Sequence, residues 1–309
     1  MQLLPGSVVI FFACVLGIVA AAPTESGIDA LRMTAEAGDP KAQYELGLLY
    51  ASGAGLTKSS DEAVKWVRKS AAQGNAAAQA YLGVMFANGE GVVKAPAEAV
   101  KWYRQAAEQG DADAQCNLGV SYSLGQGIAQ DPKEAVRWLR KAAEQGNATA
   151  LYDLGDIYCS GTGVEKYLAE AVKWYRQAAE HGDVVAQFNV GVMYAGGEGV
   201  RKNEIEALAW FNLSAISGDQ VAVKYCARLE RRLGNQKALV ARKRSMELLK
   251  QIELNKAAHA KDAAGAFAAP PARPPEPRAT SQRTDSPASL PAPPASNAAN
   301  GSAPLTQPK

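Results

Sequence analysis

The sequence predicts an all-α protein in which pairs of helices stack along the chain as an α-solenoid. The evidence for this fold class is the regular spacing of tryptophan and glycine. The five tryptophans lie 36 residues apart: Trp66, Trp102, Trp138, Trp174 and Trp210. Two glycine columns keep the same step, at 38-74-110-146-182-218 and at 47-83-119-155-191. Two more, 53-89-125-161-197 and 55-91-127-163-199, keep it without an insertion. A fixed period of this length indicates a stacked array, which normally binds on an extended surface.

The first unit, residues 39–74, has the pattern of two amphipathic helices separated by a glycine break. Ala42, Leu46 and Tyr50 recur at four-residue steps, as on one face of a helix. Gly53-Ala54-Gly55 then favours a helix end, because glycine readily adopts the positive φ of such an exit. A second apolar stripe around Trp66 predicts the second helix. Each repeat is therefore expected to be a helix-turn-helix.

The starts and interiors of these helices give finer expectations. Asp131 and Asn203 can cap a second helix with their side chains, whereas Ala95 and Tyr167 cannot, so we expect looser starts at the latter two. Gly47 and its equivalents lie inside the first helix, where glycine costs about 1 kcal/mol relative to alanine. We infer a close helix–helix approach there. Exposed i,i+4 ion pairs are expected on the second helices: Arg104–Glu108, Arg140–Glu144 and Arg176–Glu180.

The period also sets the domain organisation. Five full repeats are expected at 39–74, 75–110, 111–146, 147–182 and 183–218. Residues 26–38 align with a second helix and are expected to cap the array. After residue 218 we expect a sixth first helix and then a charged capping helix from Arg228 to about Lys256. The predicted solenoid domain spans residues 23–258.

The N-terminus has the pattern of a secretory signal. Residues 8–22 are almost entirely apolar and end in three alanines. This stretch is short for a membrane span but fits the apolar region of a signal peptide. No lysine or arginine precedes it. We predict a signal peptide over residues 1–22 and export, with a periplasmic location; an uncleaved N-terminal anchor is the alternative.

The C-terminal segment differs in composition from the repeats. Eleven of the 16 prolines follow residue 269, among alanine and serine. Such a composition lacks the apolar residues of a packed core. The sequence therefore predicts a disordered tail over residues 259–309.

The repeat unit resembles the Sel-1-like repeat, a relative of the tetratricopeptide repeat. The shared pattern is A-x-x-x-L-G-x-x-Y-x-x-G-x-G-V, then E-A-V-K-W and A-A-x-x-G. The second copy carries it at Ala78, Leu82, Gly83, Phe86, Gly89, Gly91, Val92, Ala99, Trp102, Ala106, Ala107 and Gly110. The resemblance implies a right-handed superhelix, first helices on its concave side, and adaptor roles in proteins that are often bacterial and exported. One subgroup, with a cysteine pair in every repeat, has been ascribed β-lactam-related activity; this chain lacks those pairs.

Residue types used in catalysis and metal binding are sparse. The four cysteines, Cys14, Cys116, Cys159 and Cys226, form no C-x-x-C pair and share no repeat position. We expect them to be packing residues, and we predict no cofactor and no metal. The tryptophan column is interpreted as the core between repeats, not as a ladder of aromatic ligand sites. The net charge of +2 gives no reason to expect nucleic acid as a partner.

A basic stretch near the end of the array raises two further partner classes. It runs from Arg228 to Lys250, lacks interleaved aromatics and also contains Glu230 and Glu247. We interpret it as a charged capping helix instead of a nucleic-acid site. Peripheral contact with an anionic membrane surface is a weaker alternative.

The candidate binding site is a ladder of residues on the first helices. Its first column is Glu45, Tyr81, Asn117, Asp153 and Asn189, and the next turn adds Leu48, Val84, Val120, Asp156 and Val192. Tyr81 is the expected anchor, because a rigid aromatic ring with a polar tip suits recognition. Asp153 and Asp156 share a helix face, but no nucleophile or metal ligand accompanies this carboxylate pair.

These observations predict a non-enzymatic protein–protein interaction scaffold that binds its partners on the concave surface. A hydrolase acting on the cell wall or a β-lactam is the alternative, and it would require a nucleophile and a base that converge in a cleft. A secreted effector is a third possibility, for which no transport signal is recognised.

Overall fold

The structure of the protein is a computed structural model that describes residues 25–263. The helices are α1 (Glu25–Glu36), α2 (Pro40–Ser52), α3 (Ser60–Ala72), α4 (Ala76–Asn88), α5 (Pro96–Glu108), α6 (Ala112–Leu124), α7 (Pro132–Glu144), α8 (Ala148–Ser160), α9 (Leu168–Glu180), α10 (Val184–Gly196), α11 (Glu204–Ile216), α12 (Gln220–Leu233) and α13 (Asn235–Ala263). Every regular element in this range is a helix, which confirms the predicted fold class. Among these helices, none combines the length and apolar character needed to cross a bilayer. The signal peptide and the tail beyond residue 263 were predicted for residues outside the described range.

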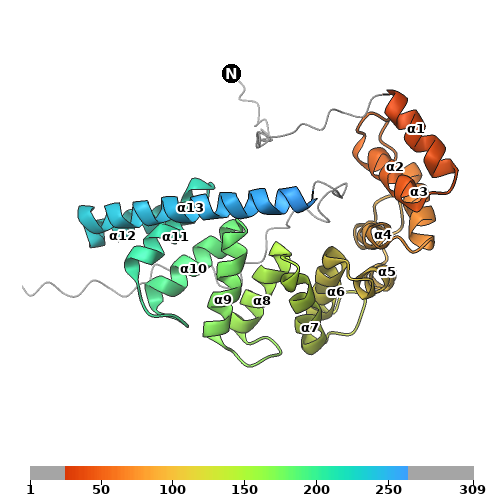
Figure 1. Ribbon diagram of the computed structural model, residues 1–309. Coiled ribbons are helices and arrows are strands. Elements are labelled where there is room, and N and C mark those ends of the chain that lie inside the picture. Colours follow the sequence, from red (N-terminus) through yellow and green to blue (C-terminus); the bar gives the residue numbers. More distant parts are fainter. Residues whose placement is uncertain (1–24, 264–309) are drawn as a thin grey trace, which may run out of the picture.

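Consecutive helices pack against each other along the chain, and the pairs follow an arc (Figure 1). The arc runs from α1 at one end to α12 and α13 at the other. Within each repeat the even-numbered first helix packs on the odd-numbered second helix that follows it. The architecture is therefore a solenoid in which each unit contacts its neighbours.

The five first helices from α2 to α10 have the same length because they begin and end with the same local chemistry. At each start an Asp or Asn side chain accepts a hydrogen bond from a backbone N–H three residues later, as Asp39 does from Ala42. At each end a glycine in the left-handed conformation terminates the helix, as Gly53 does at φ 79°. Equal bounds keep equivalent residues in one register across the array.

The second helices confirm the expected difference in their starts. Asp131 and Asn203 each accept two backbone N–H groups in the first turn of their helices. Ala95 and Tyr167 make no side-chain capping hydrogen bond. Second helices α5 and α9 therefore lack a stabilisation that typically amounts to about 1 kcal/mol.

Glycines inside the first helices allow the two helices of a repeat to touch. A Cβ atom built on Gly83 would lie 2.6 Å from the ring of Tyr103, and one on Gly119 would lie 2.7 Å from Cγ of Leu139. Real Cβ contacts are essentially never so short. The close approach inferred from the sequence is confirmed, and it explains why glycine stays at a position where it lowers helix propensity.

Loop glycines make a second close contact, between successive repeats. Gly91 has a φ of 67°, and a Cβ there would lie 2.6 Å from the carbonyl oxygen of Ser60. The equivalent glycines lie equally close to the first turn of the preceding second helix: Gly127 at Pro96, Gly163 at Pro132 and Gly199 at Leu168. Each glycine loop thus covers the start of the second helix in the repeat before it.

Buried glutamines connect the repeats through a column of hydrogen bonds. Gln43 Nε2 donates to the carbonyl oxygen of Ala35 at 3.1 Å, and Gln73 Nε2 donates to Gln43 Oε1 at 2.8 Å. The same pairing recurs at Gln79–Gln109 and Gln115–Gln145. In the fourth repeat Leu151 and His181 replace both members together. In the fifth repeat Ser217 replaces only the second member, and the side-chain oxygen of buried Gln187 has no hydrogen-bond partner in the described part of the chain.

The arginines on the second helices make a different contact from the expected one. Arg104 donates to the hydroxyl of Tyr122 in the next repeat at 3.0 Å, and its guanidinium lies over that ring. The same contact joins Arg140 to Tyr158 and Arg176 to Tyr194. The predicted i,i+4 pairs with glutamate are wrong, because stacking on a ring one repeat away is available to a long planar side chain.

The tryptophans belong mainly to the core. Trp66, Trp138 and Trp210 are buried, while Trp102 and Trp174 are half-buried and pack against core clusters. Trp138 shares a cluster with Ala99 of the preceding repeat, so the column joins neighbouring units. The interpretation of this column as core is confirmed.

The C-terminal cap differs from the expected charged helix. Helix α12 continues through Arg228 to Leu233 and stops at Gly234. Helix α13 then extends to Ala263, so residues 259–263 are helical and the prediction that the tail begins at residue 259 is wrong for them. Helix α13 packs along α11 and reaches α9. The glycine that breaks the two helices was visible in the sequence, but it stands outside the period of 36.

Candidate partner-binding surface

Equal helix lengths place the predicted ladder residues at equivalent positions on successive first helices. Glu45, Asn117, Asp153 and Asn189 lie on α2, α6, α8 and α10, and each is partly exposed. One turn further on, Asp156, Val120 and Val192 are also partly exposed, whereas Leu48 and Val84 are buried. The structure thus presents the column as a row of polar side chains beside an apolar strip.

Tyr81, the expected anchor, is the exception in this row. Its side chain is only 8% exposed, and its ring meets that of Tyr44 edge to face at 6.3 Å between centroids. Burial, followed by the charge of Glu90, raises the pKa of Tyr81. The expectation of a freely projecting ring is corrected, because Tyr81 packs in a buried cluster with Tyr44 and Leu48 of the first repeat.

Tyr44 brings an unusual polar group to this side of the molecule. The residue is 5% exposed, and its hydroxyl has no hydrogen-bond partner among the residues that the structure describes. Burial raises the pKa of Tyr44, with smaller contributions from Tyr81 and from the carboxylates of Asp111 and Asp113. Those two carboxylates lie at the start of α6, the first helix two repeats further along.

Acidic side chains concentrate on the first helices of the third and fourth repeats. Helices α6 and α8 carry three carboxylates, Asp113, Asp153 and Asp156, and contain no lysine or arginine. Asp113 is exposed and accepts a hydrogen bond from Asn147 Nδ2 at 2.8 Å. The middle of the ladder is therefore a region of negative potential, which attracts basic groups.

Asp156 departs from the apolar residues at its repeat position, and the second helix explains why. The hydroxyl of Tyr175 on α9 donates to Asp156 Oδ1 at 3.3 Å. Burial and then the charge of Asp156 raise the pKa of Tyr175, so this phenol stays protonated. Asp156 therefore satisfies a buried hydroxyl in addition to any role at the surface.

Two of the cysteines, Cys159 and Cys226, lack the environment of a nucleophile. Burial raises the pKa of Cys159, and the nearby Asp156 raises it further. Burial also raises the pKa of Cys226, to about 12, with a contribution from Glu230. Thiolates are the reactive form, and both groups are thiols at neutral pH. Within residues 25–263 no cluster of three or more His, Cys, Asp or Glu side chains suits a metal ion.

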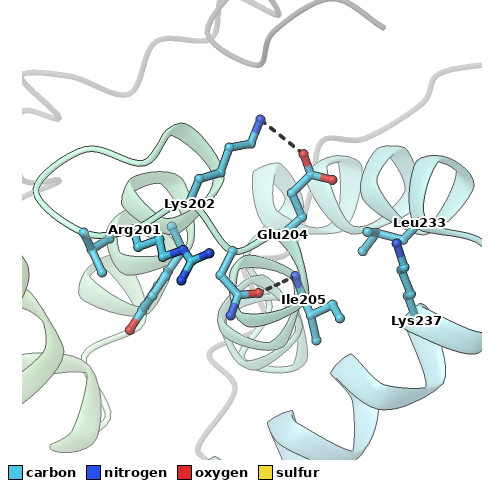
Figure 2. A pocket seen from close by; sticks show the side chains of 9 residues that line it. Arg201, Lys202, Glu204, Ile205, Leu233 and Lys237 are labelled. Carbon is cyan, nitrogen blue, oxygen red and sulfur yellow. Dashed lines mark hydrogen bonds and ion pairs between the residues drawn. The ribbon is translucent and has the colours of Figure 1, made fainter. Parts of the chain in front are cut away.

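A pocket of about 560 Å³ lies at the C-terminal end of the array (Figure 2). Its lining consists of Tyr194, Val200, Arg201, Lys202, Asn203, Glu204, Ile205, Leu233 and Lys237. Glu204 pairs with Lys202 at 3.3 Å and with Arg232 at 2.8 Å, and Asn203 caps α11 through the N–H of Ile205. The single carboxylate of the lining is thus already neutralised.

The repeat geometry explains the origin of this pocket. At the internal junctions a glycine loop covers the first turn of the preceding second helix, as Gly199 does at Leu168. The chain after α12 turns directly into α13 at Gly234 and contains no such loop. The first turn of α11 is consequently left open, and the pocket is the space that a sixth loop would fill.

The fold and this surface define a class of protein, the helical-repeat scaffold. The Sel1 repeat family model matches residues 40–75, 76–111, 112–147, 148–183 and 184–219. The chain therefore belongs to the Sel1 repeat family. The matched units begin one residue after those set by the tryptophan and glycine spacing. No curated protein matches the chain.

Two solved structures support the assignment. A protective antigen of uropathogenic Escherichia coli strains, c5321, has 36% sequence identity and a TM-score of 0.66 over 79% of this chain and 53% of that one. A Sel1 repeat protein from Oxalobacter formigenes has 34% identity and a TM-score of 0.61 over 67% of this chain and 60% of that one. The chain thus spans little more than half the length of these relatives.

Proposed function

We propose that this chain is an exported, non-enzymatic scaffold that binds protein partners on the exposed surface of its first helices. Proteins of the Sel1 repeat family are generally interaction scaffolds, and the uniform register of the first helices produces an extended surface. The observation that carries the proposal is the row of partly exposed polar side chains on α2, α6, α8 and α10. The alternative hydrolase has no supporting constellation in the described part of the chain, where the two thiols with raised pKa stay protonated.

The chemistry of the surface narrows the class of partner. Asp113 and Asp153 contribute negative charge at its centre, while Val120 and Val192 add apolar area. A partner segment that carries lysine or arginine beside aliphatic side chains complements this pattern. Tyr44 and Tyr81 support the surface from beneath, since both rings are buried.

Export is proposed from the sequence of residues 8–22, whose apolar run ends in alanines. Fractionation of a bacterial host tests it. We expect the chain in the periplasm with an N-terminus near residue 21 or 22. Recovery of the intact N-terminus in the membrane fraction supports the anchored alternative.

The binding proposal is tested with exposed, charge-neutralising substitutions. A partner is first identified by capture on the immobilised chain, and its affinity is then measured for Asp113→Asn/Asp153→Asn. We expect about ten-fold weaker binding, the effect of removing two charges at a wet interface. The matched control is Asp61→Asn/Glu108→Gln, which removes two charges from second helices. Equal affinity for both double variants contradicts the proposed surface, provided that both melt like the original chain.

A further inference from the structure

Charge is distributed unevenly along this molecule. The five repeats, residues 39–218, contain 17 basic and 21 acidic side chains. The two capping helices, from Gln220 to Ala263, contain 11 basic and four acidic side chains. The array is therefore mildly acidic, and the cap at its C-terminal end is strongly basic.

Helix α13 has one face buried on the array. Ala238, Ala241, Ser245, Leu248 and Ile252 are buried, and they recur at the three- and four-residue steps of one helical face. Ala238 and Ala241 pack in the cluster that contains Phe211 of α11, and Leu248 and Ile252 pack in the cluster that contains Trp210. This contact determines the rotation of α13 about its axis, so the opposite face points away from the repeats, along the edge of the fold (Figure 1).

The outward face of α13 carries exposed apolar side chains. Leu239 and Leu254 are each 56% exposed, and Met246 is 71% exposed. Val240 is exposed beside them. Leucine and methionine on the surface are ordinary when scattered singly, but here they recur along one side of a helix over about 22 Å.

Basic side chains alternate with this apolar row. Lys243 and Lys250 are exposed and fall between Leu239, Met246 and Leu254 on the same face. The two arginines of α13 are already paired: Arg242 with Glu230 at 2.7 Å, and Arg244 with Glu206 at 3.2 Å and with Glu247. Glu253 and Glu247 flank this face on its two sides, and Glu247 pairs with Arg244.

We propose that the outward face of α13, defined by Leu239, Lys243, Met246, Lys250 and Leu254, docks on an anionic phospholipid surface. A convex helix with single exposed aliphatic side chains offers no groove for a partner helix, but it suits the interface of a bilayer. Its apolar side chains enter the headgroup boundary, and the lysine stems extend so that the ammonium groups meet lipid phosphates. The basic cap orients this end of the protein toward the negative surface, and the acidic repeats turn away from it.

The test uses the full chain and vesicles of phosphatidylcholine, either pure or with one-third phosphatidylglycerol. Bound protein is measured by co-sedimentation at low and high salt. We expect binding to the anionic vesicles that weakens as salt rises. Lys243→Glu/Lys250→Glu should weaken it by about ten-fold or more, since each lysine near such a surface contributes measurably. Leu239→Gln/Met246→Gln should weaken it several-fold.

The control is Lys41→Glu/Lys133→Glu, which makes the same charge change at exposed positions on α2 and α7. It should bind within about two-fold of the original chain, and circular dichroism should show equal helix content in all variants. All variants share one N-terminus, so its apolar segment contributes equally to each. Absence of salt-sensitive binding to the anionic vesicles overturns the proposal, as does equal weakening by the control. Binding to polyglutamate but not to vesicles also overturns it and indicates an acidic protein partner.

Discussion

Single residues determine how closely neighbouring helices approach in this solenoid. Gly119 shows the constraint clearly, since a Cβ there would meet both Cγ of Leu139 at 2.7 Å and the backbone oxygen of Ala135 at 3.1 Å. Both atoms belong to the second helix of the same repeat, and the backbone oxygen cannot move without shifting that helix. The short distance between α6 and α7 therefore leaves no room for any side chain at position 119.

We expect Gly119→Ala to lower the free energy of unfolding by about 1–3 kcal/mol, because overpacking outweighs the gain in helix propensity. Gly196→Ala is the matched control at the last residue of α10. A Cβ there would first meet the flexible side chain of Glu198 at 3.3 Å. That substitution should be neutral or stabilise by up to about 1 kcal/mol. Urea unfolding measures both, and a tolerated Gly119→Ala contradicts the close-approach argument.

Alkaline pH should destabilise the fold through its buried phenols. Burial raises the pKa of Tyr175 above its ordinary value of 10.0, so the folded state keeps the proton while the unfolded chain releases it. The unfolded state therefore binds fewer protons above pH 10, and the free energy of unfolding falls as pH rises. Tyr175→Phe should flatten this fall, whereas Tyr167→Phe, at an exposed position, should not. The measurement compares how steeply the free energy of unfolding falls between pH 8 and pH 11 in the original chain and in each variant.

At the scale of the helix, equivalent elements differ in their ends and contacts. Helices α5 and α9 begin without a side-chain cap, while α7 and α11 are capped. The fourth repeat also lacks the glutamine pair, because Leu151 and His181 replace it. Local stability should therefore vary along the array, with α9 near its minimum.

Removal of a core tryptophan tests how stability is divided among the elements. Trp210 is 1% exposed, and Trp210→Ala should cost about 3–5 kcal/mol. Trp102 is half-buried, so Trp102→Ala should cost less. Because each unit contacts its neighbours, Trp210→Ala should loosen the C-terminal repeats first and split the unfolding transition. Hydrogen exchange would show the loss around α11; uniform loss over the whole chain is the contrary result.

At the scale of the whole molecule, two surfaces of different character coexist. The first helices present an acidic centre around Asp153, and the outward face of α13 presents lysines with leucine and methionine. The two surfaces lie on different elements, so one could engage a partner while the other is occupied. A scaffold that docks on a membrane through α13 would leave its first helices available to recruit protein partners.

The predicted C-terminal tail, residues 264–309, lies beyond the described range. Deletion of residues 264–309 should leave the melting temperature and the helical signal per folded residue unchanged, because that composition cannot form a core. Thermal melting followed by circular dichroism measures both. A clear loss of stability would show that the tail docks on the array.

The sequence by itself determined the repeat, its boundaries to within one residue of the family match, and the roles of the glycines. The period of 36 is strict, and the glycines that keep it end helices or permit close contacts between them. Local chemistry of this kind acts over a few residues, so it can be recognised without coordinates. The partial exposure of Glu45 and Asp153 followed from the same period.

Only the tertiary structure decided which side chains meet between neighbouring helices. It turned Arg104 toward Tyr122 instead of Glu108, buried Tyr81, and gave Asp156 a hydroxyl partner in Tyr175. These contacts depend on how helices pack and join residues 18 or more positions apart, which periodicity does not specify. The open first turn of α11 and the outward face of α13 likewise arise where the array stops, because the last unit has no neighbour to cover it.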